Sequence, residues 1–309
     1  MAQKKKEVSK EHQDESIRFC KFFSQIIKKR TDINRLRIID VNKYDVSDFY
    51  TWAESHYKPK TFNKCMLALK AFFNYLIGDE DVVMKNPFGS YIPKKITPNE
   101  ILTLSQKEFF AILKAIDTAD PIQKLGGTGK RKNMYKPYLK DGFMLMLLTG
   151  GRREEVVELK WGDIFTSIDN VKFFRSHNLK VEKSKKVRNI YKYIPINTDL
   201  FNLLENLGYY KNKNTNEYIF YPERNESTKT IMNYLSKAFT HYKKAAGIEK
   251  EVSMKHLRKT YISWVNRVLG KDTGKITSHS THQVLKDYYL DPTILSAIEK
   301  VALEIKIFG

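Results

Sequence analysis

Cysteine is nearly absent from this chain of 309 residues, which contains only Cys20 and Cys65. Two cysteines cannot form the disulfide framework that stabilises small secreted domains. Neither residue belongs to a C-x-x-C motif or has a histidine nearby, so the spacing argues against a zinc site. Because both lie in apolar, helix-like patterns, we expect two buried thiols in a reducing compartment and no bound metal.

Long apolar runs are absent as well. No stretch approaches the ~18 apolar residues that a membrane-spanning helix needs. The first ten residues are polar, with lysine at positions 4, 5 and 6, and they lack the apolar centre of a signal peptide. The sequence therefore predicts a soluble intracellular protein without a membrane partner.

Acidic residues are too few to balance the basic ones. The chain has 35 Asp and Glu against 55 Lys and Arg, which gives a formal net charge of +20. A surplus of this size favours a polyanionic partner, although a merely solvated basic surface is the alternative. The length fits two domains of ordinary size, each able to bury its own core.

Residues 1–88 predict a small all-helical domain. Their apolar residues recur at spacings of three and four in stripes that begin at Ile17, Phe49 and Met66. Residues 89–103 form the predicted interdomain linker. The segment around them, from Asn86 to Glu100, holds three prolines and a glycine, which prevent a continuous helix.

The second domain, residues 104–309, combines helical patterns with short strands. It opens with a capping box, in which Ser105 caps a helix and Glu108 reaches back to the backbone. Three alternating segments predict a small antiparallel sheet: Trp161–Phe165, Val171–Arg175 and Arg188–Ile196. Helical patterns surround them at Lys140–Leu148, Asp199–Leu207, Lys229–Ala246 and His256–Leu269. The predicted fold is mainly α with a small antiparallel sheet, so the second domain is of the α+β type.

A basic, glycine-containing stretch lies between Pro121 and Lys140. Gly129-Lys130 invites comparison with a phosphate-binding P-loop, but Arg131 follows where that motif needs Ser or Thr, and no strand pattern precedes it. We expect a mobile basic loop instead.

An unusual combination of polar motifs recurs along the second domain. Two arginine motifs come first: Thr149-Gly-x-Arg152-x-x-Glu155 with Leu159-Lys-Trp-x-Asp163 after it, then Lys255-x-x-Arg258 overlapping Leu257-Arg258-x-Thr260. The last motif is His279-Ser280, with Tyr288 and Tyr289 nine and ten positions beyond the histidine. Such residues have little reason to accompany one another except around a phosphate. In order and separation the motifs resemble the three boxes of the tyrosine recombinase (phage integrase) family, and the resemblance covers nearly the whole chain.

The resemblance implies both a fold and an activity. A helical, SAM-like core-binding domain and a catalytic domain would form a two-domain clamp on duplex DNA, working as a homo-oligomer, expected to be a tetramer, with accessory DNA-bending proteins as further partners. The enzyme would be a site-specific recombinase or integrase that cuts and rejoins DNA through a 3′-phosphotyrosyl intermediate. That link retains the bond energy, so neither ATP, a metal nor another cofactor is expected. The resemblance implies a cytoplasmic, nucleoid-associated location.

The resemblance also assigns roles to individual residues. Arg152 and Arg258 would stabilise negative charge on the phosphoryl oxygens, and Glu155 would support Arg152 rather than do chemistry. The alternative for Arg152 and Glu155 is a surface ion pair of little energetic weight. Lys183, or alternatively Lys185, would protonate the leaving oxygen from a β-hairpin.

Two assignments stay open. Tyr289 is the preferred nucleophile, because the Leu-Asp-Pro after it resembles a short exit into another helix, but Tyr288 also has a family-like spacing. Lys255 stands where the family usually has histidine, and as a catalytic residue it would hydrogen-bond the phosphate while charged, or act as the base only if its neighbours depress its pKa. The general base is therefore not assigned, and His256 is expected to pack or to contact the backbone. His279 would donate a hydrogen bond to a non-bridging oxygen.

Basic residues outside these motifs are expected to contact the DNA backbone. The predicted hairpin region from Lys180 to Lys192 holds six basic residues against a single Glu182, and four of them are among the expected contacts. The expected contacts are Lys58, Lys60, Lys64, Lys70, Lys130, Arg131, Lys132, Lys180, Lys185, Lys186 and Arg188. Two other functions remain compatible with the same residues: nicking and resealing of one duplex, as by a type IB topoisomerase, and DNA binding by a catalytically decayed integrase homologue.

Overall fold

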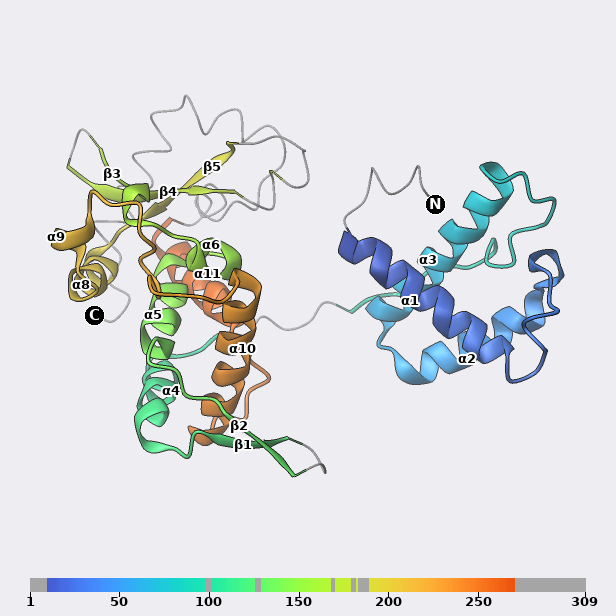
Figure 1. Ribbon diagram of the computed structural model, residues 1–309, viewed down its shortest axis with the longest axis horizontal. Coiled ribbons are helices and arrows are strands. Elements are labelled where there is room, and N and C mark those ends of the chain that lie inside the picture. Colours follow the sequence, from blue (N-terminus) through green and yellow to red (C-terminus); the bar gives the residue numbers. More distant parts are fainter. Residues whose placement is uncertain are drawn as a thin grey trace. The chain divides into compact units, whose positions relative to one another are not determined.

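The computed structural model describes residues 10–97, 102–125, 129–167, 170–178, 182 and 189–269. The chain folds as two compact units, Met1–Asn99 and Glu100–Gly309 (Figure 1). Among the described residues, no helix is long and apolar enough to cross a membrane.

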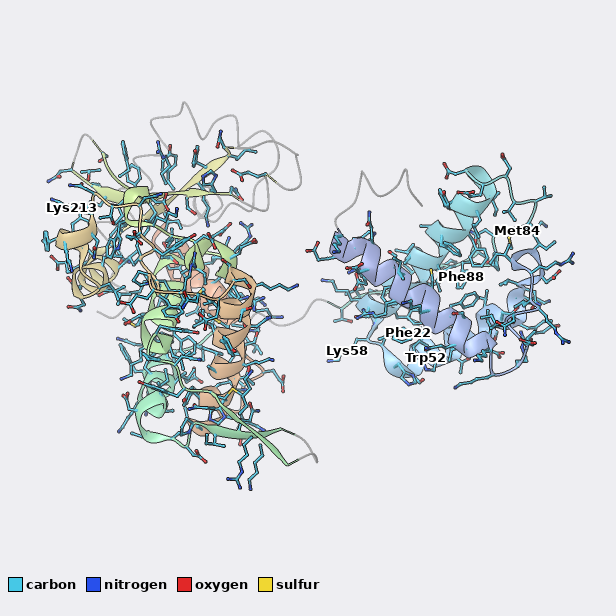
Figure 2. All side chains as sticks on the ribbon, viewed as in Figure 1. Phe22, Trp52, Lys58, Met84, Phe88 and Lys213 are labelled. Atoms are coloured by element: carbon cyan, nitrogen blue, oxygen red, sulfur yellow. The ribbon has the colours of Figure 1, made fainter. Side chains whose placement is uncertain are left out.

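The described part of the first unit packs three helices together: α1 (Lys10–Ile27), α2 (Lys43–His56) and α3 (Pro59–Gly78), with a 3₁₀ turn η2 (Ile38–Asp40) before α2. A capping box at Asn42 begins α2, and α3 begins with Pro59, where the missing N–H costs nothing. Phe22 and Trp52 pack with ring centroids 5.4 Å apart (Figure 2). Aromatic residues dominate the core, which includes Phe19, Phe23, Phe49, Phe62, Phe73 and Phe88.

The beginning of the predicted linker packs against this first unit. The Asn63 side chain donates a hydrogen bond to the Lys94 carbonyl and accepts one from the Lys94 N–H, both at 2.8 Å. The Tyr91 hydroxyl donates to the same asparagine. Together with the buried Phe88, these contacts fix the extended chain that follows α3.

The second unit is built around one apolar core. Its longer helices are α4 (Gln106–Thr118), α5 (Leu139–Thr149), α10 (Thr228–Ala245) and α11 (Lys255–Leu269), and its shorter elements are α6 (Arg153–Val157), η4 (Trp161–Asp163), α8 (Thr198–Asn206) and α9 (Tyr209–Asn212). An antiparallel sheet has the order β3 (Ile164–Thr166), β4 (Lys172–His177) and β5 (Tyr191–Pro195) (Figure 1). The predicted fold class, mainly α with a small antiparallel sheet, is confirmed.

The sequence predicted the start of α4 correctly but placed the start of β3 too early. The capping box is present, because the Ser105 hydroxyl accepts the Glu108 N–H at 3.2 Å and the Ser105 N–H donates to the Glu108 carboxylate at 2.8 Å. The strand predicted from Trp161 starts only at Ile164, because the buried Trp161 begins a 3₁₀ turn instead.

The stretch after α4 corrects one prediction. Residues expected to form a mobile basic loop contain a hairpin, in which β1 (Ile122–Leu125) pairs with β2 (Lys130–Asn133). The expectation that no strand precedes the glycines is therefore wrong, although Arg131 still stands where a P-loop requires Ser or Thr. The hairpin has few apolar residues to signal it. Backbone pairing holds it, helped by the Lys132 ammonium, 4.9 Å from the Tyr234 ring centroid.

Candidate active site

The turn between α5 and α6 requires glycine at its start. Gly150 has a φ of +57°, and a Cβ added there would lie 2.1 Å from the Tyr261 ring. The Thr149 hydroxyl accepts the Gly151 N–H at 3.1 Å and so braces the turn from the end of α5. This local geometry fixes where Arg152, the next residue, enters α6.

Arg152 and Glu155 bind each other through two groups. The backbone N–H of Arg152, the residue before α6, donates to Glu155 Oε2 at 2.8 Å. The guanidinium Nη1 donates to Glu155 Oε1, also at 2.8 Å. The Glu155 side chain is fully buried, whereas 27% of the Arg152 side chain is exposed. A surface ion pair is therefore excluded: a buried carboxylate holds an arginine that stays partly accessible to a ligand.

Lys192 on β5 completes the buried part of the site. Its ammonium lies 2.5 Å from Glu155 Oε2, and only 4% of the residue is exposed. Burial lowers the pKa of Lys192 to about 8, although Glu155 opposes that effect. Burial by itself would raise the pKa of Glu155, but Lys192 and Arg152 hold it below its usual value. The three groups form one charged network inside the fold.

The sequence did not single out Lys192, which was expected to be one of several basic residues in the predicted hairpin region from Lys180 to Lys192. A signal was present, however. Ile190, Lys192, Ile194 and Ile196 alternate along the strand, so the lysine occupies a register otherwise held by isoleucine. A lysine in an inward-facing register needs a buried anion, and Glu155 is that anion.

Arg258 on α11 contacts the same α5–α6 turn, although it lies far from that turn in the sequence. Its Nη1 donates to the Gly150 carbonyl at 2.5 Å, so the second arginine is tied to the turn that carries the first. Burial and the charge of Arg152 lower the pKa of Arg258, since the two guanidinium groups lie within electrostatic range. Thr260 anchors α11, because its hydroxyl accepts the Leu104 N–H at 3.0 Å.

Lys255 and His256 face different environments at the start of α11. Lys255 is exposed. His256 is only 7% exposed, and its Nδ1 accepts the Ser253 N–H at 2.8 Å. Burial lowers the pKa of His256. The histidine therefore contacts the backbone, and Lys255 is the residue of this pair that solvent or a ligand can reach.

Asn178 adds a polar group beside the arginine. It directly follows β4, is fully buried, and its Oδ1 lies 3.5 Å from Arg152 Nη1. Its Nδ2 has no hydrogen-bond partner within the described ranges. An unpaired amide donor next to a guanidinium is suited to an anionic oxygen.

Arg152, Glu155, Lys192 and Arg258 form what we call the arginine cluster. It contains three cations and one carboxylate, which leaves a surplus of two positive charges. Guanidinium groups bind phosphate oxygens through paired hydrogen bonds, and they act most strongly where water is excluded. The cluster can therefore bind a phosphoryl group and stabilise negative charge that develops on it.

Several predicted site residues lie outside the described residues. They are His279, Tyr288, Tyr289 and the hairpin residues Lys180, Lys183, Lys185, Lys186 and Arg188. The backbone of Lys130 belongs to β2, but its side chain also lies outside the description.

The remaining predicted DNA contacts differ in their surroundings. Lys64 forms an ion pair with Glu15, and Lys70 donates to the Gly89 carbonyl at 2.6 Å. The other residues are exposed or partly exposed: Lys58, Lys60, Arg131 and Lys132.

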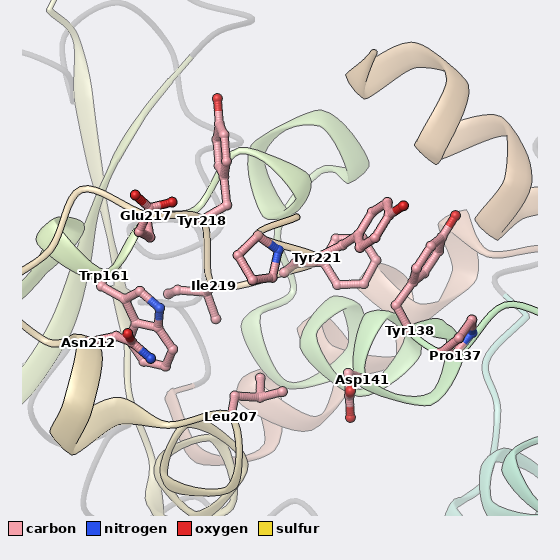
Figure 3. A pocket seen from close by; sticks show the side chains of 12 residues that line it. Pro137, Tyr138, Asp141, Trp161, Leu207, Asn212, Glu217, Tyr218, Ile219 and Tyr221 are labelled. Carbon is pink, nitrogen blue, oxygen red and sulfur yellow. The ribbon is translucent and has the colours of Figure 1, made fainter. Parts of the chain in front are cut away.

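A cavity of about 310 Å³ lies elsewhere in the second unit. Its lining includes Tyr138, Asp141, Trp161 and Tyr218 (Figure 3), and no residue of the arginine cluster contributes to it. In the part of the chain that the structure describes, no group of His, Cys, Asp and Glu is arranged to hold a metal ion.

Comparison with known proteins gives a consistent match. Residues 103–289 match the model of the phage integrase family. A lambda integrase dimer bound to a COC′ core site is similar over 93% of this chain and 73% of that chain, with 15% identity and a TM-score of 0.63. The Tn1549 transposon integrase bound to transposon right end DNA is similar over 97% and 95%, with 17% identity and a TM-score of 0.60. The XerH recombinase bound to its difH substrate is similar over 90% and 74%, with 17% identity and a TM-score of 0.55. No curated protein matches the chain.

Proposed function

Because the chain belongs to the phage integrase family, we propose that it is a site-specific recombinase that cuts and rejoins duplex DNA through a 3′-phosphotyrosyl intermediate. The arginine cluster carries this proposal. Two guanidinium groups, from the α5–α6 turn and from α11, converge with a buried carboxylate and a buried lysine. A surplus of positive charge in a mostly buried site favours a phosphodiester whose oxygens gain charge in the transition state.

In the proposed reaction a tyrosine hydroxyl attacks the scissile phosphorus. We assign this role to Tyr289, with Tyr288 as the alternative. The new phosphorus–oxygen bond forms as the bond to the 5′-oxygen breaks, while Arg152 and Arg258 bind the non-bridging oxygens. The phosphotyrosyl bond conserves the energy of the bond that it replaces, so a 5′-hydroxyl can reverse the step without ATP or a metal.

The tyrosine hydroxyl loses a proton in this step and the leaving 5′-oxygen gains one, and residues beyond the two arginines would assist. Lys183, or alternatively Lys185, would protonate the leaving 5′-oxygen. His279 would donate a hydrogen bond to a non-bridging oxygen. Lys255, which is exposed at the start of α11, would contact the phosphate in place of the usual histidine.

We also propose how the protein engages DNA. The domains at residues 1–88 and 104–309 would hold the duplex between them, with Lys58, Lys60 and Arg131 among the phosphate contacts. Lambda integrase has been solved as a tetramer bound to a Holliday junction. A tetramer acting on two duplexes in the cytoplasm, with accessory bending proteins, is the corresponding proposal for this chain.

Trapping of the covalent intermediate tests the proposed function. The protein is incubated with a library of nicked duplexes of randomised sequence, in which the short 3′ fragment diffuses away after cleavage and prevents rejoining. Covalent complexes are collected under denaturing conditions, and the recovered DNA then serves as the defined substrate. Tyr289→Phe is expected to abolish the adduct, Tyr288→Phe to retain it, and the matched control Tyr210→Phe, at an exposed tyrosine of α9, to match the wild type.

The outcomes separate the competing functions. Retention of the adduct in Tyr289→Phe and its loss in Tyr288→Phe would move the nucleophile by one position. Relaxation of supercoiled DNA without joining of two duplexes would identify topoisomerase-like nicking and resealing. Sequence-selective binding without any adduct would overturn the proposed chemistry and leave a DNA-binding homologue.

A further inference from the structure

Burial of the Lys192 side chain costs free energy. It lies on β5 opposite Ser176 of β4, and both residues are 5% exposed or less. A buried ammonium loses its hydration, so it persists only where an anion and hydrogen bonds compensate. An apolar residue would fit the alternating pattern of this strand at lower cost. The presence of a lysine at this position is therefore best explained by its contact with Glu155.

The partner, Glu155, divides its two oxygens between different donors. Oε2 accepts from the Lys192 ammonium at 2.5 Å and from the Arg152 backbone N–H at 2.8 Å. Oε1 is left for the Arg152 guanidinium at 2.8 Å. Because Lys192 holds Oε2 from the sheet, the carboxylate cannot rotate without losing this contact, and Oε1 keeps its aim at the guanidinium.

We propose that Lys192 is a positioning residue for DNA cleavage: it orients Glu155, and through Glu155 it fixes the Arg152 guanidinium for the scissile phosphate. The inference rests on the proposed function. Lys192 itself need not touch the DNA, which agrees with its burial. The sheet thereby sets the position of an arginine that belongs to the helical part of the unit.

The charged groups around Lys192 determine how its contact with Glu155 responds to pH. They come from each neighbouring element: Glu155 from α6, Arg152 from the turn before it and Arg258 from α11. Burial and the two arginines favour the neutral amine, and Glu155 favours the ammonium, which leaves the pKa of Lys192 at about 8. The lysine orients Glu155 fully below that pH and loses its charge above it.

The test measures single-turnover adduct formation at saturating DNA, using the nicked substrate and the full chain. At pH 7, Lys192→Met is expected to slow adduct formation by about tenfold to a hundredfold, because one partner of a charged hydrogen bond is lost. The deficit is expected to shrink as the pH rises through 8, since the wild type then loses the same charge. Lys172→Met, on the neighbouring strand with its ammonium over the Phe201 ring, is the matched control and is expected to match the wild type.

A second variant separates positioning from folding. Lys192→Met combined with Glu155→Gln removes both buried charges, so its resistance to urea is expected to recover above that of Lys192→Met while adduct formation stays slow. The inference is overturned if Lys192→Met reacts at the wild-type rate, if its deficit is equal at pH 7 and pH 9.5, or if the double variant regains the wild-type rate. Failure of the wild type to form any adduct would instead overturn the proposed function.

Discussion

Gly150 links the stability of the second unit to the geometry of the arginine cluster, and its replacement by alanine has a calculable cost. A left-handed φ of +57° costs an alanine about 1 kcal/mol. The added Cβ would also lie 2.1 Å from the buried Tyr261 ring, so backbone or ring must move, at about 1–3 kcal/mol for overpacking. We therefore expect Gly150→Ala to lower the free energy of unfolding by about 2–4 kcal/mol.

Gly247 provides the matched control for this prediction. It also follows a helix and has a left-handed φ of +70°, but no atom lies within 4 Å of the Cβ that alanine would add. Gly247→Ala should therefore cost only the conformational part, about 1 kcal/mol. Urea unfolding of the two full-length variants gives the difference between their free energies of unfolding, provided that this free energy falls with urea concentration at the same slope in both. If Gly150→Ala is no more destabilising than Gly247→Ala, the Tyr261 ring does not oppose the added Cβ.

The remaining predictions concern buried ionisable groups. Glu155→Gln leaves the Lys192 ammonium without its anion, so the free energy of unfolding should fall by about 3–5 kcal/mol in urea, whereas the exposed control Glu249→Gln should change little. Between pH 8 and 10.5 the unfolded chain keeps the Lys192 proton that the folded chain loses. The free energy of unfolding of the wild type should therefore rise by about 3 kcal/mol over this range relative to that of the double variant Lys192→Met/Glu155→Gln. Equal pH profiles of the two proteins would contradict this. Burial raises the pKa of Cys20 to about 11 and of Cys65 to about 12, so alkylation by iodoacetamide at pH 8 should be at least ~100-fold slower in the native chain than in urea.

Features that depend on local sequence were predictable. The longer helices of both units follow apolar spacings of three and four, and the capping box at Ser105 needs only residues three positions apart. The order of the polar motifs identified the arginines that meet at one site, because each motif carries its own short pattern around Arg152 or Arg258.

Features that depend on distant partners were not predictable in the same way. The β1–β2 hairpin is held by backbone pairing, which any residue can supply, so its polar sequence gave no strand signal. Lys192 belongs to a basic segment, and its contact with Glu155, which joins β5 to α6 in the folded chain, cannot be read from that segment. The alternation with isoleucine marked its register but not its partner.

Mass spectrometry can identify the residue that carries the DNA in the covalent complex. Covalent complexes from the nicked library are digested with nuclease and trypsin, which cuts after Lys286 and Lys300 to release the peptide Asp287–Lys300. We expect this peptide to carry a 3′-linked nucleotide, and we expect fragmentation in the mass spectrometer to locate the phosphate on Tyr289. A nucleotide on a peptide outside this segment would rule out both Tyr288 and Tyr289 as the nucleophile, and no modified peptide from a protein that binds its site would rule out the proposed phosphotyrosyl link.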